Sequence, residues 1–192
     1  FDREDKKLIA RLFVLFTGTM EAKSQPIEIR RRGANALVRT KILEQFSKSI
    51  YAANYFPPAA SVISTSVFAR TSPNPKLQNA GLMFMQWCFR HSDDKVMEKL
   101  ADIVMAGLLR TLDTTGTKEE ADLVLRGSAY KAIGLLGCRT PRVITLPVLK
   151  RMFVALKKED QSVSTHLQDT LAMCCPRFSV TRKGEEVDDD LL

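Results

Sequence analysis

The sequence predicts an all-α protein, an α-solenoid of about four stacked two-helix repeats that wind into a right-handed superhelix. Apolar residues recur with helical spacing in one segment after another, and short clusters of Pro, Gly, Asn and Asp separate these segments. No stretch shows the sustained alternation of a β-strand. The hydrophobic fraction of 45% and charged fraction of 27% indicate a folded rather than a disordered chain.

Eight helices are expected, with limits set by where the helical spacing of apolar residues starts and stops. They cover residues 4–16, 26–50, 58–70, 75–90, 93–112, 118–138, 142–157 and 160–175. In helix 93–112 one apolar stripe holds Leu100, Ile103, Val104, Gly107 and Leu108. The corresponding residues are Val124, Leu125, Ala129, Ala132, Ile133 and Leu136 in helix 118–138, and Leu146, Leu149, Met152, Phe153 and Leu156 in helix 142–157.

Residues with capping chemistry mark the starts of two of these helices. Asn74 and Pro75 form an N-cap followed by a first-turn proline. Thr117 and Glu120 have the spacing of a capping box for helix 118–138.

Helix 142–157 has two competing start signals. Thr140 and Pro141 again read as a cap and a first-turn proline. Pro147, however, lies about one turn further on, so the helix either begins later or kinks there.

The helices come in pairs, and the second helices share a pattern. Three apolar or small positions coincide when they are aligned: Ile29, Leu77, Leu125 and Val163; Gly33, Gly81, Ala129 and Leu167; and Leu37, Met85, Ile133 and Leu171. The successive offsets of 48, 48 and 38 residues bracket the period of about 40–47 residues typical of HEAT and armadillo repeats.

One two-helix unit cannot bury its apolar face alone, so neighbouring units are expected to stack into a continuous core. The small residues at the second shared position would let helices approach closely. We therefore assign residues 1–176 to a HEAT-repeat array, with repeats at about 3–50, 54–90, 93–138 and 142–175, and residues 177–192 to an acidic tail or linker.

The residues suggest no catalytic, cofactor-binding or metal-binding site, and they leave the partner-binding residues open. His91 and His166 are 75 positions apart, with no Cys or carboxylate at metal-ligand spacing. Small buried thiols are the favoured interpretation of Cys88, Cys138, Cys174 and Cys175. An enzyme with an unrecognised site stays an alternative.

Two kinds of segment are candidates for partner contact. The apolar cluster of Met83, Phe84, Met85, Trp87 and Phe89 could be an exposed patch, but its place on a sandwiched helix favours core packing. The turns at 71–76 and 113–118 are better candidates, because solenoids place binding loops along one edge.

The net charge of +7 raises the alternative of a helical array that binds nucleic acid. The first 50 residues hold eleven Lys and Arg against six Asp and Glu, whereas the last ten include five acidic residues. Only Arg30, Arg31 and Arg32 form a run, with no interleaved aromatic residues for base stacking. Nucleic-acid binding is therefore disfavoured, and a solvated helix face is the preferred interpretation.

The chain begins at Phe1 rather than Met, which suggests a piece of a longer protein. It contains no apolar run near the roughly 18 residues needed to span a bilayer. Its charged start is unlike a secretory signal, and its thiols and lack of glycosylation sequons favour the cytoplasm or nucleus.

Several stretches between residues 27 and 175 resemble a known family. The segment VFARTSPNPKLQNAGLMFMQWCFRHSDD (67–94) is followed by VMEKLADIVMAGLLRTLD, DLVLRGSAYKAIGLLGCRTPRV and LPVLKRMFVALKKEDQSVSTHLQDTLAMC. In order and spacing, these resemble the large HEAT-repeat adaptor and scaffold proteins associated with the proteasome. Residues 1–26 and those from 176 onward carry no such motif.

The resemblance implies a scaffold segment, without catalytic residues or cofactor, in a protein that binds the 26S proteasome. That family bridges the core particle and the regulatory cap. It also tethers proteasomes to membrane-trafficking and motor proteins, which implies endomembrane association through partners; no small-molecule substrate is expected. Another HEAT scaffold, of the nuclear-transport or phosphatase type, is the alternative that shares only the architecture.

Overall fold

The computed structural model describes residues 3–18, 34–68 and 74–177. These residues form helices and connecting turns, and none of them lies in a β-strand. The α-helices are α1 (Arg3–Thr17), α2 (Ala36–Phe46), α3 (Ile50–Asn54), α4 (Pro58–Ser66), α5 (Pro75–His91), α6 (Asp94–Thr114), α7 (Glu120–Arg139), α8 (Leu146–Leu156) and α9 (Gln161–Cys174). Two 3-10 turns, η2 (Pro141–Val143) and η3 (Cys175–Arg177), flank the last helical pair.

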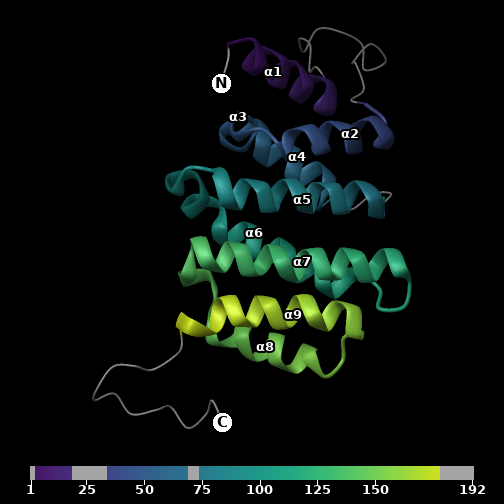
Figure 1. Ribbon diagram of the computed structural model, residues 1–192, viewed down its shortest axis with the longest axis vertical. Helices are drawn as coiled ribbons and strands as arrows, with labels where there is room; N and C mark the ends of the chain where they lie inside the picture. Colours follow the sequence, from purple (N-terminus) through teal and green to yellow (C-terminus); the bar gives the residue numbers. More distant parts are fainter. Residues whose placement is uncertain (1–2, 19–33, 69–73, 178–192) are drawn as a thin grey trace, which may run out of the picture.

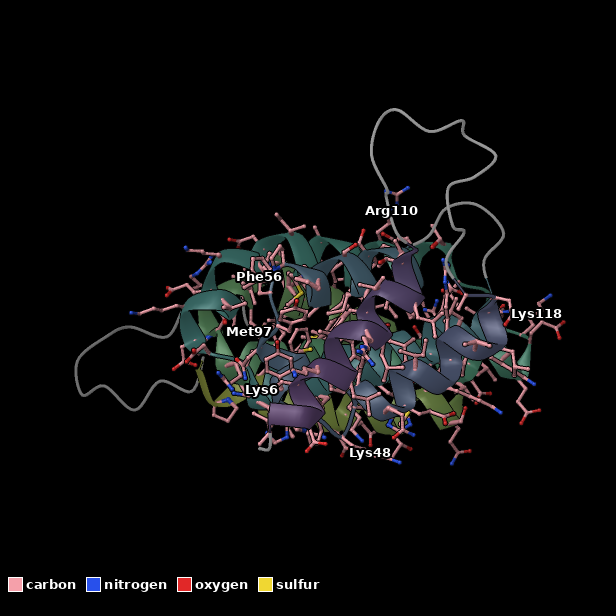
Figure 2. All side chains as sticks on the ribbon, turned by 90° about the horizontal axis from the view of Figure 1, so that it is seen from above. Lys6, Lys48, Phe56, Met97, Arg110 and Lys118 are labelled. Carbon is pink, nitrogen blue, oxygen red and sulfur yellow. The ribbon has the colours of Figure 1, made fainter. Side chains whose placement is uncertain are left out.

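The helices stack in two layers along the long axis of the molecule (Figure 1). Helices α2, α5, α7 and α9 pack one on the next, while α4, α6 and α8 pack against α5, α7 and α9 respectively. Viewed down that axis, Lys48 beside α2 and Arg110 of α6 lie on opposite sides (Figure 2). This confirms the all-α solenoid. The repeat limits and the handedness of the superhelix stay predictions, and the acidic tail lies outside the described residues.

Two hydrophobic clusters meet at α5. One side of α5 contributes Leu77, Ala80, Phe84 and Cys88 to a cluster with α1, α2, α3 and α4. Its other side contributes Leu82, Met85 and Phe89 to a cluster that runs through α6, α7, α8 and α9. Because α5 is buried on both sides, it joins the two halves of the array.

Of the three predicted helix starts, one is correct, one is wrong, and one follows the later of its two options. Asn74 caps α5 as predicted, its Oδ1 accepting a hydrogen bond from the Leu77 N–H at 3.0 Å. The capping box is wrong, because α7 begins after Glu119 with no side-chain cap bond. The α8 helix begins behind Thr145, with Pro147 in its first turn, so of the two options the later start is correct.

The single helix predicted over 26–50 is wrong within the described residues. Asn35 caps a new helix start by accepting from the Val38 N–H at 3.0 Å, and Ser49 caps α3 by accepting from the Ala52 N–H at 3.1 Å. Both side chains offer the backbone an alternative to continuous helix, which explains the two breaks. Ile29 and Gly33 lie outside the described residues.

The register predicted for the first repeat is also wrong. Trp87 Nε1 donates to the Ser49 carbonyl at 2.9 Å, and the rings of Phe46 and Phe84 lie 5.4 Å apart. Both pairs are 38 residues apart, not 48. Accordingly Leu37, aligned with buried Met85, is 68% exposed. The offset varies along the array because the segments between the stacked helices differ in length.

Three predicted inward residues, on α6, α7 and α8, point outward instead. Ile103 on α6 is 70% exposed and Phe153 on α8 is 47% exposed. The buried face of α6 is formed by Met97, Ala101, Val104, Met105, Leu108, Thr111 and Leu112. Val124, assigned to the inward face of α7, is likewise half exposed, and Leu146 and Leu156 are only half-buried. The predicted helical period is correct, but the predicted buried stripes are wider than those in the structure.

Gly81 shows the close helix approach expected of a small residue. A Cβ atom placed there would lie 2.4 Å from Ser66 Oγ and 2.8 Å from Val67 Cγ2. The close partner is therefore the end of α4, within the same helical pair.

Candidate partner-binding surface

The residues considered for chemistry in the sequence are dispersed. The His91 ring lies against Trp87, with centroids 3.9 Å apart and planes tilted by 42°, whereas His166 is exposed beside Gly127, some distance along the array. Among the described residues, no three His, Cys, Asp or Glu side chains are grouped so that they could hold a metal ion. These side chains therefore offer no constellation to which a reaction could be assigned.

The four thiols do not share one environment. Cys88 and Cys174 are buried as predicted, and burial raises the pKa of each to about 12. Cys175 is half-buried. Cys138 is exposed, so the prediction of a buried thiol is wrong there.

The apolar cluster on α5 belongs mostly to the core. Phe84, Met85 and Phe89 are buried, which confirms core packing for these three. Trp87 is half-buried, and Met83 is 56% exposed. Met83 is therefore the member of this cluster that a partner could reach.

Of the two turns predicted to contact partners, one is described in full. Residues 113–118 are exposed apart from half-buried Thr115. In the other turn, residues 71–73 lie outside the described part, and Asn74, Pro75 and Lys76 are exposed. Whether either turn binds a partner stays a prediction.

A surface hollow of about 620 Å³ lies along the outward side of α6. Exposed Ile103 and Arg110 line it, together with residues that follow α4 and residues at the starts of α5 and α7. Its threonines, Thr111, Thr114 and Thr115, donate their hydroxyl protons to backbone carbonyls one turn earlier in α6. The hollow is therefore a stretch of helix surface. None of these threonine hydroxyls donates to a side chain that could act as a base.

The most elaborate polar site in the described structure is buried and joins three elements. Arg126 of α7 pairs through its Nη2 and Nε atoms with the two carboxylate oxygens of Glu159, which follows α8. Arg126 Nη1 donates to the carbonyls of Leu112 and Thr115 at 2.7 and 3.0 Å, at the end of α6. Tyr130 Oη donates to Glu159 at 2.7 Å. We call this group the Arg126–Glu159 clamp.

The electrostatics of the clamp follow from these bonds. Burial opposes ionisation of Glu159, but the hydrogen bonds from Arg126 and Tyr130 outweigh it and hold the Glu159 pKa below its usual value. The bond to Glu159 raises the pKa of Arg126. The pair is therefore ionised, and the guanidinium completes the last turn of α6, where free carbonyls favour a cation.

Three further arginines tie neighbouring pairs of helices. Arg139 Nη2 donates to the Ser92 carbonyl at 2.7 Å and to Asp94 at 2.5 Å. Arg142 binds Asp102 at 2.7 Å, and Arg151 binds Asp113 at 2.6 Å and the Leu109 carbonyl at 3.1 Å. These contacts fix α7, η2 and α8 against α6.

The sequence alone does not reveal the Arg126–Glu159 clamp or the other three arginine contacts. One signal was available: Arg126 stands in the stretch LVLRGSAY, next to residues assigned to the inward face of the helix. A charge at such a position needs a partner when buried. The identity of that partner, 33 residues away, depended on the fold.

The exposed surface of α8 combines cations with apolar side chains. It consists of Lys150, Phe153 and Val154 of α8 and of Lys157 and Lys158, which follow the helix; all five are exposed, with Phe153 at 47% and Val154 at 54%. At 3.6 residues per turn these five positions fall within an arc of about 140°. Met152, on the opposite side of the helix, and Leu149, beside the arc, are buried in the core. We call these five residues the α8 face.

This fold and these surfaces define an α-solenoid scaffold, a class of protein that presents surfaces to partners. The chain belongs to the family described as "Proteasome component ECM29, N-terminal", whose family model matches residues 1–191. That match includes the first 26 residues, for which the quoted motifs gave no resemblance.

One similar curated protein is the "Proteasome component ecm29" of Schizosaccharomyces pombe. It is 25% identical over 150 residues, which is 78% of this chain and 8% of that protein. The chain therefore spans less than a tenth of the length of this relative. No solved structure matches the chain significantly.

Proposed function

We propose that this chain is a non-catalytic scaffold segment through which a longer parent protein binds the 26S proteasome and bridges its core particle and regulatory cap. The single observation that carries the proposal is the family match, which covers residues 1–191. The solenoid fold supports it, because stacked helical pairs offer long surfaces suited to large partners.

The test is co-purification of the full-length parent with intact 26S proteasomes at low salt. We expect the parent to be retained on immobilised proteasomes and released as the salt concentration rises, since charged contacts between exposed surfaces are screened. A parent that never co-purifies with intact proteasomes would overturn the proposal.

Bridging is tested separately from binding. A bridging scaffold contacts both subassemblies, so the parent should bind assembled 26S particles more tightly than isolated core particles or isolated caps. Equal affinity for the assembled particle and for one isolated subassembly would indicate a ligand of that subassembly rather than a bridge.

We further propose that the parent works in the cytoplasm and nucleus, and that trafficking or motor proteins bind it outside these 192 residues. Within the described residues, no helix has both the length and the apolar character to cross a membrane. A fluorescently tagged parent should follow proteasomes in both compartments. Loss of its endomembrane fraction after removal of the rest of the parent, with residues 1–192 retained, would support partners outside this segment.

A further inference from the structure

We infer that Cys138 and Cys174 close a reversible disulfide bridge when hydrogen peroxide reaches the exposed Cys138 thiol. The bridge joins the end of α7 to the end of α9, and so links the last two helical pairs covalently. It is a modification of the chain and not a catalytic reaction. It goes beyond the proposed function and does not depend on it.

The backbones of α7 and α9 approach each other closely at Gly134. A Cβ atom placed on Gly134 would lie 3.3 Å from the Cα atom of Thr170. Since a carbon–carbon bond of this kind is about 1.5 Å long, the Cα atoms of Gly134 and Thr170 lie within about 5 Å of each other. The two helices are therefore almost in backbone contact at this point.

Cys138 and Cys174 lie one turn beyond that contact. The helices run in the same direction, because Gly127, Gly134 and Gly137 meet successively later residues of α9. Residues four apart lie on the same side of a helix, one turn further on. Two helices that run together diverge little over one turn, so the Cys138 and Cys174 Cα atoms stay near the roughly 4.4–6.8 Å that disulfides span.

The sulfur atoms agree with this register. Cys138 Sγ donates to the carbonyl oxygen of Met173, the residue before Cys174, at 4.0 Å. Cys174 Sγ lies 3.2 Å from the place that a Cβ atom of Gly137, the residue before Cys138, would take. Burial first, and then the nearby thiols, raise the pKa of Cys174 to about 12, with Cys138 acting more strongly than the adjacent Cys175.

The two thiols differ in their access to solvent. Cys138 is exposed, whereas Cys174 is buried in the cluster that runs through α6 to α9. Helix α7 packs between α5 and α9 (Figure 1), so the exposure of Cys138 does not come from a missing neighbour of α7. One residue further along a helix turns the side chain by about 100°, which points Cys175 away from α7. Cys174 is therefore the partner.

The bridge forms in two steps. The Cys138 thiolate attacks one peroxide oxygen, the O–O bond breaks, and the leaving hydroxide takes up the proton that the thiol has lost. Cys138 is then a sulfenic acid. The Cys174 sulfur attacks the Cys138 sulfur, the S–O bond breaks, and water leaves with the Cys174 proton. Two thiols are oxidised and one hydrogen peroxide is reduced, which gives one disulfide and two water molecules.

The experiment uses the full-length parent, treated with hydrogen peroxide, alkylated and mapped peptide by peptide by mass spectrometry. We expect a linked pair of peptides that contain Cys138 and Cys174, with equal loss of alkylation at both thiols. Reduced glutathione should restore both thiols by thiol–disulfide exchange. Dimedone, which traps sulfenic acids, should label Cys138 at early times, because burial keeps Cys174 protonated and slows the second step.

Three variants assign the roles of the thiols. Cys174→Ala removes the buried partner, so Cys138 should pass from sulfenic to sulfinic acid without a link. Cys175→Ala is the matched control and should leave the link unchanged. Cys138→Ser changes an exposed side chain, so the fold should be kept while the link and the dimedone label are both lost.

A second readout follows the structure rather than the thiols. In the oxidised parent, amide hydrogen exchange should slow at the ends of α7 and α9, because the bridge opposes their separation. The Cys138→Ser variant should show no change on treatment with peroxide. Equal slowing in Cys138→Ser and wild type would mean that another oxidation is responsible, and would overturn the inference.

Other outcomes contradict the bridge directly. A Cys138 thiol that resists alkylation in the reduced parent is covered there, which would overturn the inference. Sulfinic acid at Cys138 of the wild type without any link would do the same, as would a link from Cys138 to Cys175 or to a cysteine elsewhere in the parent. None of these readouts involves proteasome binding, so each holds whether or not the proposed function is correct.

Discussion

At the residue scale, the Arg126–Glu159 clamp shows how one buried ion pair can organise several elements. Each charge alone would be costly to remove from water. Here the guanidinium completes the end of α6, and the carboxylate accepts from both Arg126 and Tyr130. The Glu159 side chain is only 4% exposed and that of Arg126 9% exposed, so most of the solvation of both charges comes from these partners.

The first prediction follows from that burial. Glu159→Gln leaves the Arg126 charge buried beside a neutral side chain, and we expect a loss of about 3 kcal/mol in the free energy of unfolding. Asp113→Asn is the matched control, because it removes the carboxylate of an exposed pair and should cost less than about 1 kcal/mol. Urea denaturation of both variants measures the difference, and equal losses would show that the clamp is no more important than a surface pair.

The second prediction concerns pH. The pKa of Glu159 is lowered in the folded state, so folding favours its ionised form. The resulting stabilisation is complete above the unfolded pKa, near the usual value of 4.5, and is lost as the pH falls through the lower folded pKa.

Wild type should therefore lose its advantage over Glu159→Gln as the pH is lowered from about 5 to about 3. Urea midpoints of the two proteins at several pH values check this. A gap that widens on acidification would mean that the sign assigned to the Glu159 pKa shift is wrong.

At the element scale, most helices were predictable because their apolar spacing is strong. Seven of the eight expected segments contain one α-helix each, with limits displaced by a few residues. The exception, 26–50, failed because Asn35 and Ser49 cap new helices inside it. Helical spacing continues through such caps in the sequence, so periodicity alone does not reveal them.

The third prediction tests the corrected register of α2. Leu43 is fully buried and Leu37 is 68% exposed, although the sequence alignment placed Leu37 inward. Leu43→Ala should cost about 2–5 kcal/mol in the free energy of unfolding. Leu37→Ala, the same chemical change on the exposed side, should stay within about 0.5 kcal/mol of wild type. Thermal or urea unfolding measures the loss of stability in both variants. A larger loss for Leu37→Ala than for Leu43→Ala would restore the 48-residue register.

At the scale of the whole molecule, the sequence was sufficient for the class of fold but not for its surfaces. The repeat pattern predicts which helices stack, because that pattern is set by burial. The Arg126–Glu159 clamp and the α8 face depend on which side chains meet across 30 to 50 residues of chain, and that geometry exists only once the helices are stacked. The proteasome assignment came from family resemblance and not from any residue with assignable chemistry.

The last prediction concerns cooperativity along the array. Helix α5 carries both hydrophobic clusters, and in a solenoid each helical pair is stabilised mainly by its neighbours. Phe84→Ala should remove about 3–5 kcal/mol from the cluster shared with α1 to α4. Ile133→Ala, with an equally buried side chain in α7, should weaken the other cluster by about 2–5 kcal/mol.

Hydrogen exchange, measured peptide by peptide, tests this prediction. We expect Phe84→Ala to speed exchange mainly in α1 to α5, and Ile133→Ala to speed it mainly in α6 to α9, because local opening follows the contacts that each variant removes. The same increase in every helix for both variants would mean that the array opens as one unit. In that case the two clusters at α5 would be packed separately but would unfold together.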